Sequence, residues 1–163
     1  MRNSNEPVAP RLIIGIGNPS RGDDALGSLC IEHLQALQLP DTELLTDFQL
    51  QIEYVLDLLG REEVIFVDAA ASGTEPYTFA PLAAQTDHSV TTHAVSPSAL
   101  LATSLQINGH LPPNAYLLAI RGYSFELGDA LSAQAADNLD QAIVRLDRHM
   151  TETTARIQDH MDR

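Results

Sequence analysis

The sequence LIIGIGNPSRGDDALG, at residues 12–27, determines how the rest of the chain is interpreted. It opens with an aliphatic run that has no polar alternation, which is typical of a strand buried on both faces in a parallel sheet. Gly15 and Gly17 allow a close backbone approach or a positive φ, and Pro19 disfavours helical backbone at the residue before it. Apolar residues recur at helical spacing after Asp24. The segment therefore predicts a strand, a tight turn and a helix.

A glycine-rich turn between a strand and a helix is also typical of phosphate-binding sites, but this one does not fit a dinucleotide. A fingerprint that begins at Gly15 needs its third glycine at position 20, which is Ser20. Asp23 and Asp24 also place negative charge at the start of the helix, where it would compete with a phosphate. In the simplest interpretation, Asp23 caps the helix and Asp24 is a favourable first-turn charge.

The composition excludes several classes of partner. The chain has 163 residues, of which 22 are acidic and 9 basic, for a net charge of −13. This length suits one domain. The charge opposes binding to nucleic acid or to anionic membranes, because both need lysine and arginine. The single cysteine and the lack of a signal segment or a long apolar run predict a cytoplasmic protein with no nucleic-acid or membrane partner.

Strands and amphipathic helices alternate along the chain. Further strands are predicted at residues 42–48, 63–67, 77–80 and 115–120, and further helices at 51–59, at 97–106 and from Ser132 onward. Ser96 is the predicted N-cap of the helix that Pro97 begins, and flanking prolines make 77–80 an edge strand. This order predicts an α/β fold: a single domain with a twisted, mostly parallel sheet and helices on both faces.

The domain is expected to span residues 11–150. Residues 1–10 are polar with two prolines and are predicted to be a disordered lead, and residues 151–163 are predicted to be a polar tail that frays.

Three side chains are the candidate functional residues. In a parallel sheet, sites form outside the carboxyl ends of the strands, where Asp24 and Asp68 are expected. His93 lies in the loop that enters the helix at 97–106. Two carboxylates and an imidazole could bind a divalent metal with open positions, or could form an acid/base set. Each residue alone has a structural explanation in a helix start, a turn or a loop, so their convergence is what favours a site.

Other hydrolytic arrangements are not supported. Cys30 lies on the apolar face of the first helix and is predicted to be a buried core residue. The sequence has no serine nucleophile elbow, no zinc-binding histidine pair on a helix and no paired-cysteine metal motif. An ordinary serine, cysteine or zinc protease is therefore not indicated.

The sequence resembles the hydrogenase maturation proteases, which remove the C-terminal extension from the large subunit of nickel-iron hydrogenases. The likeness covers about Arg11 to His149. It rests on four motifs, which are GIGNP with GDD at 15–24, VIFVDA at 64–69, TH at 92–93 and SFELG at 124–128. The resemblance implies an endopeptidase whose partner is a nickel-loaded large-subunit precursor.

The same resemblance assigns roles to the three candidate residues. Asp24 takes the place of the family's first acidic metal-contacting residue, Asp68 of the second and His93 of the third. These residues are then both catalytic and metal-contacting, and the nickel is carried by the substrate and not kept by this chain. His88 is a rival for His93, and the match around Thr92 and the following helix start favours His93.

Two alternatives stay open. A non-catalytic module that binds nickel or a hydrogenase subunit would keep the same three ligands. The GIGNP opening also looks like peptidyl-tRNA hydrolase, although the tyrosine and histidine-asparagine signals expected just downstream are missing and a net charge of −13 suits tRNA badly.

Overall fold

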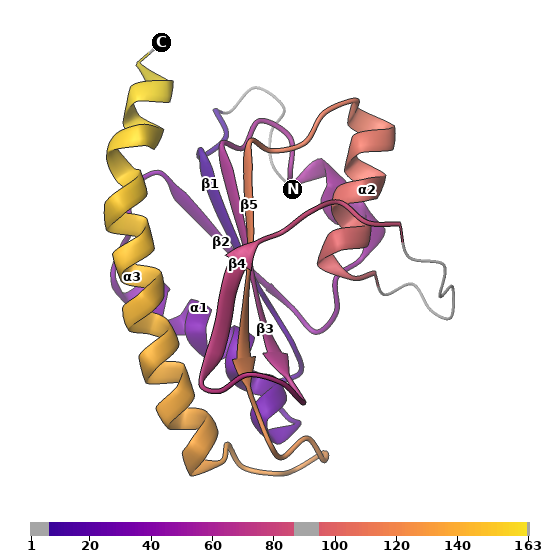
Figure 1. Cartoon of the computed structure of the whole chain (residues 1–163), viewed down its shortest axis with the longest axis vertical. Coiled ribbons are helices and arrows are strands. Elements are labelled where there is room, and N and C mark those ends of the chain that lie inside the picture. The colour runs from indigo at the N-terminus through magenta and orange to yellow at the C-terminus, as the bar shows by residue number, and fades with distance from the viewer. Residues whose placement is uncertain (1–6, 87–94, 163) are drawn as a thin grey trace.

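The computed structural model describes residues 7–86 and 95–162, and these residues contain one five-stranded sheet in the order β2-β1-β3-β5-β4 (Figure 1). The strands are β1 (Arg11–Ile16), β2 (Thr42–Asp47), β3 (Glu63–Ala70), β4 (Tyr77–Pro81) and β5 (Asn114–Arg121). Neighbouring strands pair in parallel except for β4, which runs antiparallel to β5 at the edge. The predicted α/β fold with a mostly parallel sheet and an edge strand between prolines is confirmed.

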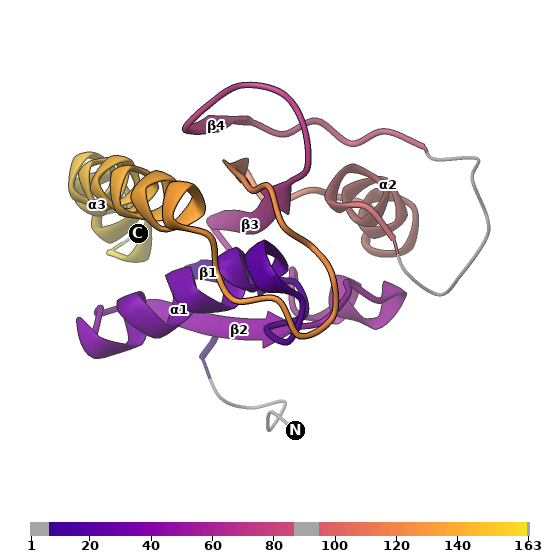
Figure 2. The same cartoon turned by 90° about the horizontal axis from the view of Figure 1, so that it is seen from below.

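Helices cover both faces of this sheet (Figure 2). The helical elements of the described residues are η1 (Gly22–Ala25) and η2 (Ile52–Leu56), both 3-10 helices, and α1 (Leu26–Ala36), α2 (Pro97–Asn108) and α3 (Ala133–Met161). Residues of α1 and α3 form one buried cluster with the sheet, and residues of η2 and α2 form the other. The predicted cap of α2 is confirmed, because the Ala99 amide donates to Ser96 Oγ at 3.1 Å.

The inner strands are apolar because both of their faces are covered. All six residues of β1 are buried. Side chains alternate along a strand, so Ile13 packs among residues of α1 and α3, whereas Leu12 and Ile14 pack toward α2. An aliphatic run without polar alternation is what this arrangement requires.

Close packing of α1 on β1 sets the position of the turn that joins them. A Cβ atom on Gly15 would lie 2.4 Å from the Gly27 carbonyl oxygen, and one on Gly27 would lie 2.4 Å from the Ile16 carbonyl oxygen. Helix and strand backbones therefore touch, which only glycine allows. The residues between them are held at the carboxyl end of β1 as a result.

Two elements differ in length from their predicted extents. The helix expected at 51–59 is only the 3-10 helix η2, followed by turns. Val55 in η2 and Leu58 in the turn that follows are the buried residues of this stretch, whereas Leu56 is exposed. Two buried side chains make an apolar stripe narrower than the one that usually faces the core along an α-helix.

The last helix continues through the residues expected to form a polar tail. α3 ends at Met161, and both Thr153 and Ile157 are buried beyond Met150. Arg11 Nη2 donates to Thr153 Oγ1 at 2.6 Å, so the start of β1 holds this part of the helix. In the described part of the chain, no helix has the length and apolar character needed to cross a membrane.

Candidate active site

The candidate site lies where the direction of the strand order reverses. From β1 the chain places β2 on one side and β3 on the other, so the crevice outside the carboxyl ends of β1 and β3 is the topological switch point of the sheet. Gly15 pairs with Val67, which puts Asp68 one residue beyond this pair. Asp24 lies in η1, which follows directly after β1. The structure thus brings both predicted carboxylates to the carboxyl ends of β1 and β3, close enough for the charge of Asp24 to act on Asp68.

A tight turn orients Asp24. Its Oδ2 atom accepts a hydrogen bond from the Asn18 amide at 2.7 Å, and its own amide donates to the Arg21 carbonyl at 3.0 Å. Gly17 has a φ of 138°, and a Cβ atom there would lie 2.0 Å from the Asp24 carbonyl oxygen. The glycine and the backbone hydrogen bonds therefore fix the carboxylate before any ligand arrives.

Asp68 has an environment that opposes its negative charge. It lies inside β3, which continues to Ala70, two residues further than the strand end expected at this carboxylate. Burial, aided by the charge of Asp24 and opposed by a 2.8 Å hydrogen bond from the Ala69 amide, raises the pKa of Asp68 to about 6. Two neighbouring carboxylates that repel each other, one of them buried, favour a cation or a shared proton.

The third predicted ligand lies outside the described residues, as does its rival. His93 and His88 both fall in the segment 87–94, so the position of either imidazole relative to the carboxylates stays a prediction. In the parts of the chain that the structure describes, no group of three histidine, cysteine, aspartate or glutamate side chains could hold a metal. Asp24 and Asp68 provide two carboxylates of the right chemistry for a divalent ion.

The predicted role of Asp23 as a helix cap is wrong. Among the described residues no side chain caps η1, and Asp23 is fully buried. Its carboxylate accepts the amides of Tyr123 at 2.6 Å, Ser124 at 3.0 Å and Ser132 at 2.8 Å, and the Ser132 hydroxyl at 2.8 Å. Although burial alone would raise the pKa of Asp23, these hydrogen bonds bring it below its usual range.

The loop between β5 and α3 therefore packs against the turn that carries the candidate residue Asp24. Gly128 donates to the Ser20 carbonyl at 2.8 Å, and Asp23 donates to the Ser124 carbonyl at 2.7 Å. The motif at 124–128 thus lies directly against the turn that carries Asp24. Sequence reasoning identified both motifs but missed their contact, because Asp23 and its partners are about a hundred residues apart. The one signal in the sequence that pointed to this contact was that the motifs at 15–24 and 124–128 both support the resemblance to the same family.

Cys30 is a core residue, as predicted. It is fully buried on α1, and burial, followed by the charge of Asp147, raises the pKa of its thiol to about 12. A thiol that stays protonated and enclosed is not a nucleophile.

The fold and its two carboxylates define a class of protein: a single-domain α/β protein with an acidic site at the switch point of its sheet. Solved structures that share this fold include hydrogenase maturation proteases, so the resemblance indicated by the motifs is confirmed for the fold as a whole. Neither the family models nor the curated proteins with which the sequence was compared gave a match.

Three of these structures show how far the similarity extends. The hydrogenase maturating endopeptidase HybD of Escherichia coli has 22% sequence identity and a TM-score of 0.70, over 88% of this chain and 93% of that one. The [NiFe] hydrogenase maturation protease HycI of Thermococcus kodakarensis has 25% identity and a TM-score of 0.67, over 85% and 90%. A hydrogenase 2 maturation peptidase of a Thaumarchaeota archaeon has 23% identity and a TM-score of 0.62, over 86% and 97%.

Proposed function

We propose that this chain is an endopeptidase that removes the C-terminal extension of a nickel-loaded hydrogenase large-subunit precursor. The observation that supports this most is the pair of carboxylates, Asp24 and Asp68, at the switch point of a fold shared with endopeptidases and peptidases of hydrogenase maturation. The elevated pKa of Asp68 is typical of a carboxylate at a functional site.

The nickel ion belongs to the substrate in this proposal. Asp24 and Asp68 offer oxygen ligands and no thiolate, a set too sparse for tight permanent binding of nickel. An ion already held by the precursor would be shared with these carboxylates, with His93 as the third ligand. The shared ion orients the C-terminal segment of the precursor at the crevice, and it can polarise the scissile carbonyl or a water molecule.

The direct test compares two forms of the precursor. Purified chain is incubated with nickel-loaded precursor and with nickel-free precursor, and the mass of the large subunit is followed. We expect a shortened subunit only from the loaded form, and little metal in the purified chain by elemental analysis. Efficient cleavage of the nickel-free form would overturn the role of nickel. Stable capture of the loaded form without shortening would overturn hydrolysis in favour of a binding module.

The proposed residues are tested by substitution. Asp24→Ala, Asp68→Ala and His93→Ala are each expected to abolish processing while the protein stays folded, and His88→Ala is the control with a mild effect. Cleavage and thermal melting are measured on the same preparations. Near-normal cleavage by any two of the three variants would exclude this site.

A further inference from the structure

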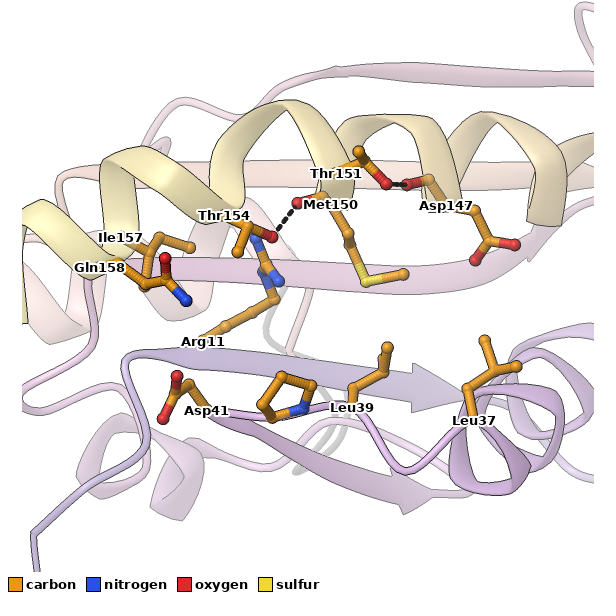
Figure 3. A pocket seen from close by; sticks show the side chains of 11 residues that line it. Arg11, Leu37, Leu39, Asp41, Asp147, Met150, Thr151, Thr154, Ile157 and Gln158 are labelled. Carbon is orange, nitrogen blue, oxygen red and sulfur yellow. Dashed lines mark hydrogen bonds between the residues drawn. The ribbon is translucent and has the colours of Figure 1, made fainter.

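A small cavity lies between α3 and the connection from α1 to β2 (Figure 3). It adjoins the amino end of β1, whereas Asp24 and Asp68 lie at the carboxyl ends of the strands. Its volume is about 210 Å³, and Arg11, the first residue of β1, forms its floor. The apolar part of the lining consists of Leu37, Leu39, Pro40, Met150 and Ile157. The cavity has no part in the proposed peptidase chemistry.

One carboxylate in this cavity lacks a partner. Asp147 projects from α3 toward Leu37 on the opposite wall (Figure 3), and its Oδ1 atom is buried without a hydrogen bond from any residue that the structure describes. The neighbouring Thr151 hydroxyl donates to the backbone carbonyl of Asp147 and not to the carboxylate. A buried carboxylate oxygen without a donor is costly, and a bound group that donates a hydrogen bond would remove the cost.

The cation that lines the cavity cannot serve Asp147. Arg11 Nε donates to Glu63 Oε2 at 2.8 Å, and Arg11 Nη2 donates to Thr153 Oγ1 at 2.6 Å. Its charge is therefore balanced by Glu63, away from Asp147. Asp41 adds a second carboxylate to the lining, and the net charge of −13 makes the surroundings favourable to cations.

We propose that this cavity binds an ammonium group carried on an aliphatic stem, which is the chemistry of a lysine side chain and of a free aliphatic amine. The ammonium donates to the Asp147 carboxylate, and the stem lies along Leu39 and Met150. Such a stem removes apolar surface from water, and a charge-assisted hydrogen bond fixes its end. The cavity is smaller than the range of roughly 300–1,000 Å³ that is usual for larger ligands, which suits one unbranched stem.

The test uses n-hexylammonium as the probe, measured by calorimetry on the full chain at low ionic strength. We expect saturable binding of n-hexylammonium and none of n-hexanoate, which has the same stem and the opposite charge. Asp147→Asn should weaken binding by about tenfold or more, because a charge-assisted bond is lost. Asp140→Asn is the matched control, since it removes an exposed carboxylate from the same helix and should leave binding unchanged.

A second variant and two peptides complete the design. Leu37→Ala shortens an apolar wall that is already 46% exposed, so it should weaken binding without unfolding the protein. A peptide with one lysine, compared with its norleucine counterpart, separates the two sources: competition by the lysine peptide alone assigns the site to a partner polypeptide, and failure of both assigns it to a free amine. Absence of saturable n-hexylammonium binding, equal binding of n-hexanoate, or unchanged affinity in Asp147→Asn would each overturn the proposal.

Discussion

Asp23 and Asp24 are neighbours in the sequence but have opposite surroundings. Asp23 is fully buried and accepts four hydrogen bonds from residues 123–132, whereas Asp24 is half-buried and acts electrostatically on Asp68. The first residue holds the site together and the second is available to a ligand. This difference separates their expected effects on stability and on activity.

Asp23→Asn should lower the free energy of unfolding by about 2–4 kcal/mol, because an amide leaves some of the buried donors without an acceptor. Asp24→Asn should change it by less than about 1 kcal/mol. Because the folded-state pKa of Asp23 is lowered, its contribution is present above the unfolded carboxyl pKa and is lost as the pH falls through the folded value. Denaturant unfolding of both variants at pH 7 and at low pH checks this, and equal losses at pH 7 would contradict it.

The ionised carboxylate of Asp68 should lower the free energy of unfolding at neutral pH. Its folded-state pKa of about 6 lies above its ordinary value of 3.8, so the folded protein binds the proton more tightly than the unfolded chain. Stability therefore falls as the pH rises from about 4 to about 6. Asp68→Asn should gain up to about 3 kcal/mol at pH 7 and nothing near pH 4. Thermal melts of this variant and the parent across that range provide the measurement, and a loss of stability at pH 7 would refute the assignment.

Cys30→Ala should retain processing activity and lose about 1 kcal/mol of stability, because a small buried side chain is shortened. Thiol reagents should leave the native protein active, since the thiol is enclosed and its pKa is about 12. The variant and the parent are compared in a cleavage assay with and without the reagent. Inhibition that disappears in Cys30→Ala would instead indicate a cysteine mechanism.

At the scale of elements, the contact between α1 and β1 governs the site. Gly27 is in α1, and alanine normally stabilises a helix by about 1 kcal/mol relative to glycine. Here a Cβ atom would meet three backbone atoms, namely the carbonyl oxygen and amide nitrogen of Ile16 at 2.4 and 2.7 Å and the carbonyl oxygen of Val67 at 2.8 Å.

Gly27→Ala should therefore destabilise the protein by about 1–3 kcal/mol, against its helix propensity, because backbone cannot give way as a side chain can. It should also reduce processing, since the displaced helix moves the turn that carries Asp24. Ser28→Ala, at the next residue of α1, is the control and should be close to neutral in both assays. A stabilised Gly27→Ala variant would show that the helix shifts freely.

The elements that the sequence predicted well are those whose signal is local. Apolar runs identified β1 and β3, and Ser96 identified the start of α2. The helix expected at 51–59 was too long, because the spacing of apolar residues does not show which of them pack against the rest of the protein. The last turns of α3 were missed because their few buried residues, Thr153 and Ile157, stand among polar ones. The same limit hid Asp23, whose partners are far away in the sequence.

At the scale of the whole molecule, a buried polar cluster joins the first strand to the last helix. Glu63 in β3 is fully buried. Its Oε2 atom accepts a hydrogen bond from Arg11 Nε at 2.8 Å, and its Oε1 atom lies 2.7 Å from His149 Nε2. Arg11 in turn reaches Thr153 near the end of α3. A buried carboxylate of this kind depends on keeping all of its partners.

Deletion of residues 151–163 should lower the free energy of unfolding by about 3–5 kcal/mol, because it removes the buried Ile157, uncovers the apolar surface on which this side chain packs, and removes the Thr153 acceptor from Arg11. If residues 151–163 were a frayed tail, their deletion would leave the free energy of unfolding unchanged. Glu152→Ala, at an exposed position within the deleted part, is the control and should be within about 0.5 kcal/mol of the parent. Denaturant unfolding of the shortened chain distinguishes the two cases.

The strand order also determines how copies of this molecule behave toward one another. β2 and β4 are the outer strands of the sheet, and an outer strand is a template onto which another chain can add. β2 carries Asp47 as well as Glu43, which pairs with Arg61, and β4 ends at Pro81; a charge and a proline discourage such addition. The protection on β2 is the charge of Asp47, so it weakens as that carboxylate is neutralised. Acidification therefore reduces both the net repulsion between molecules and the negative charge that protects β2. Self-association at low pH is expected to begin with strand addition at β2.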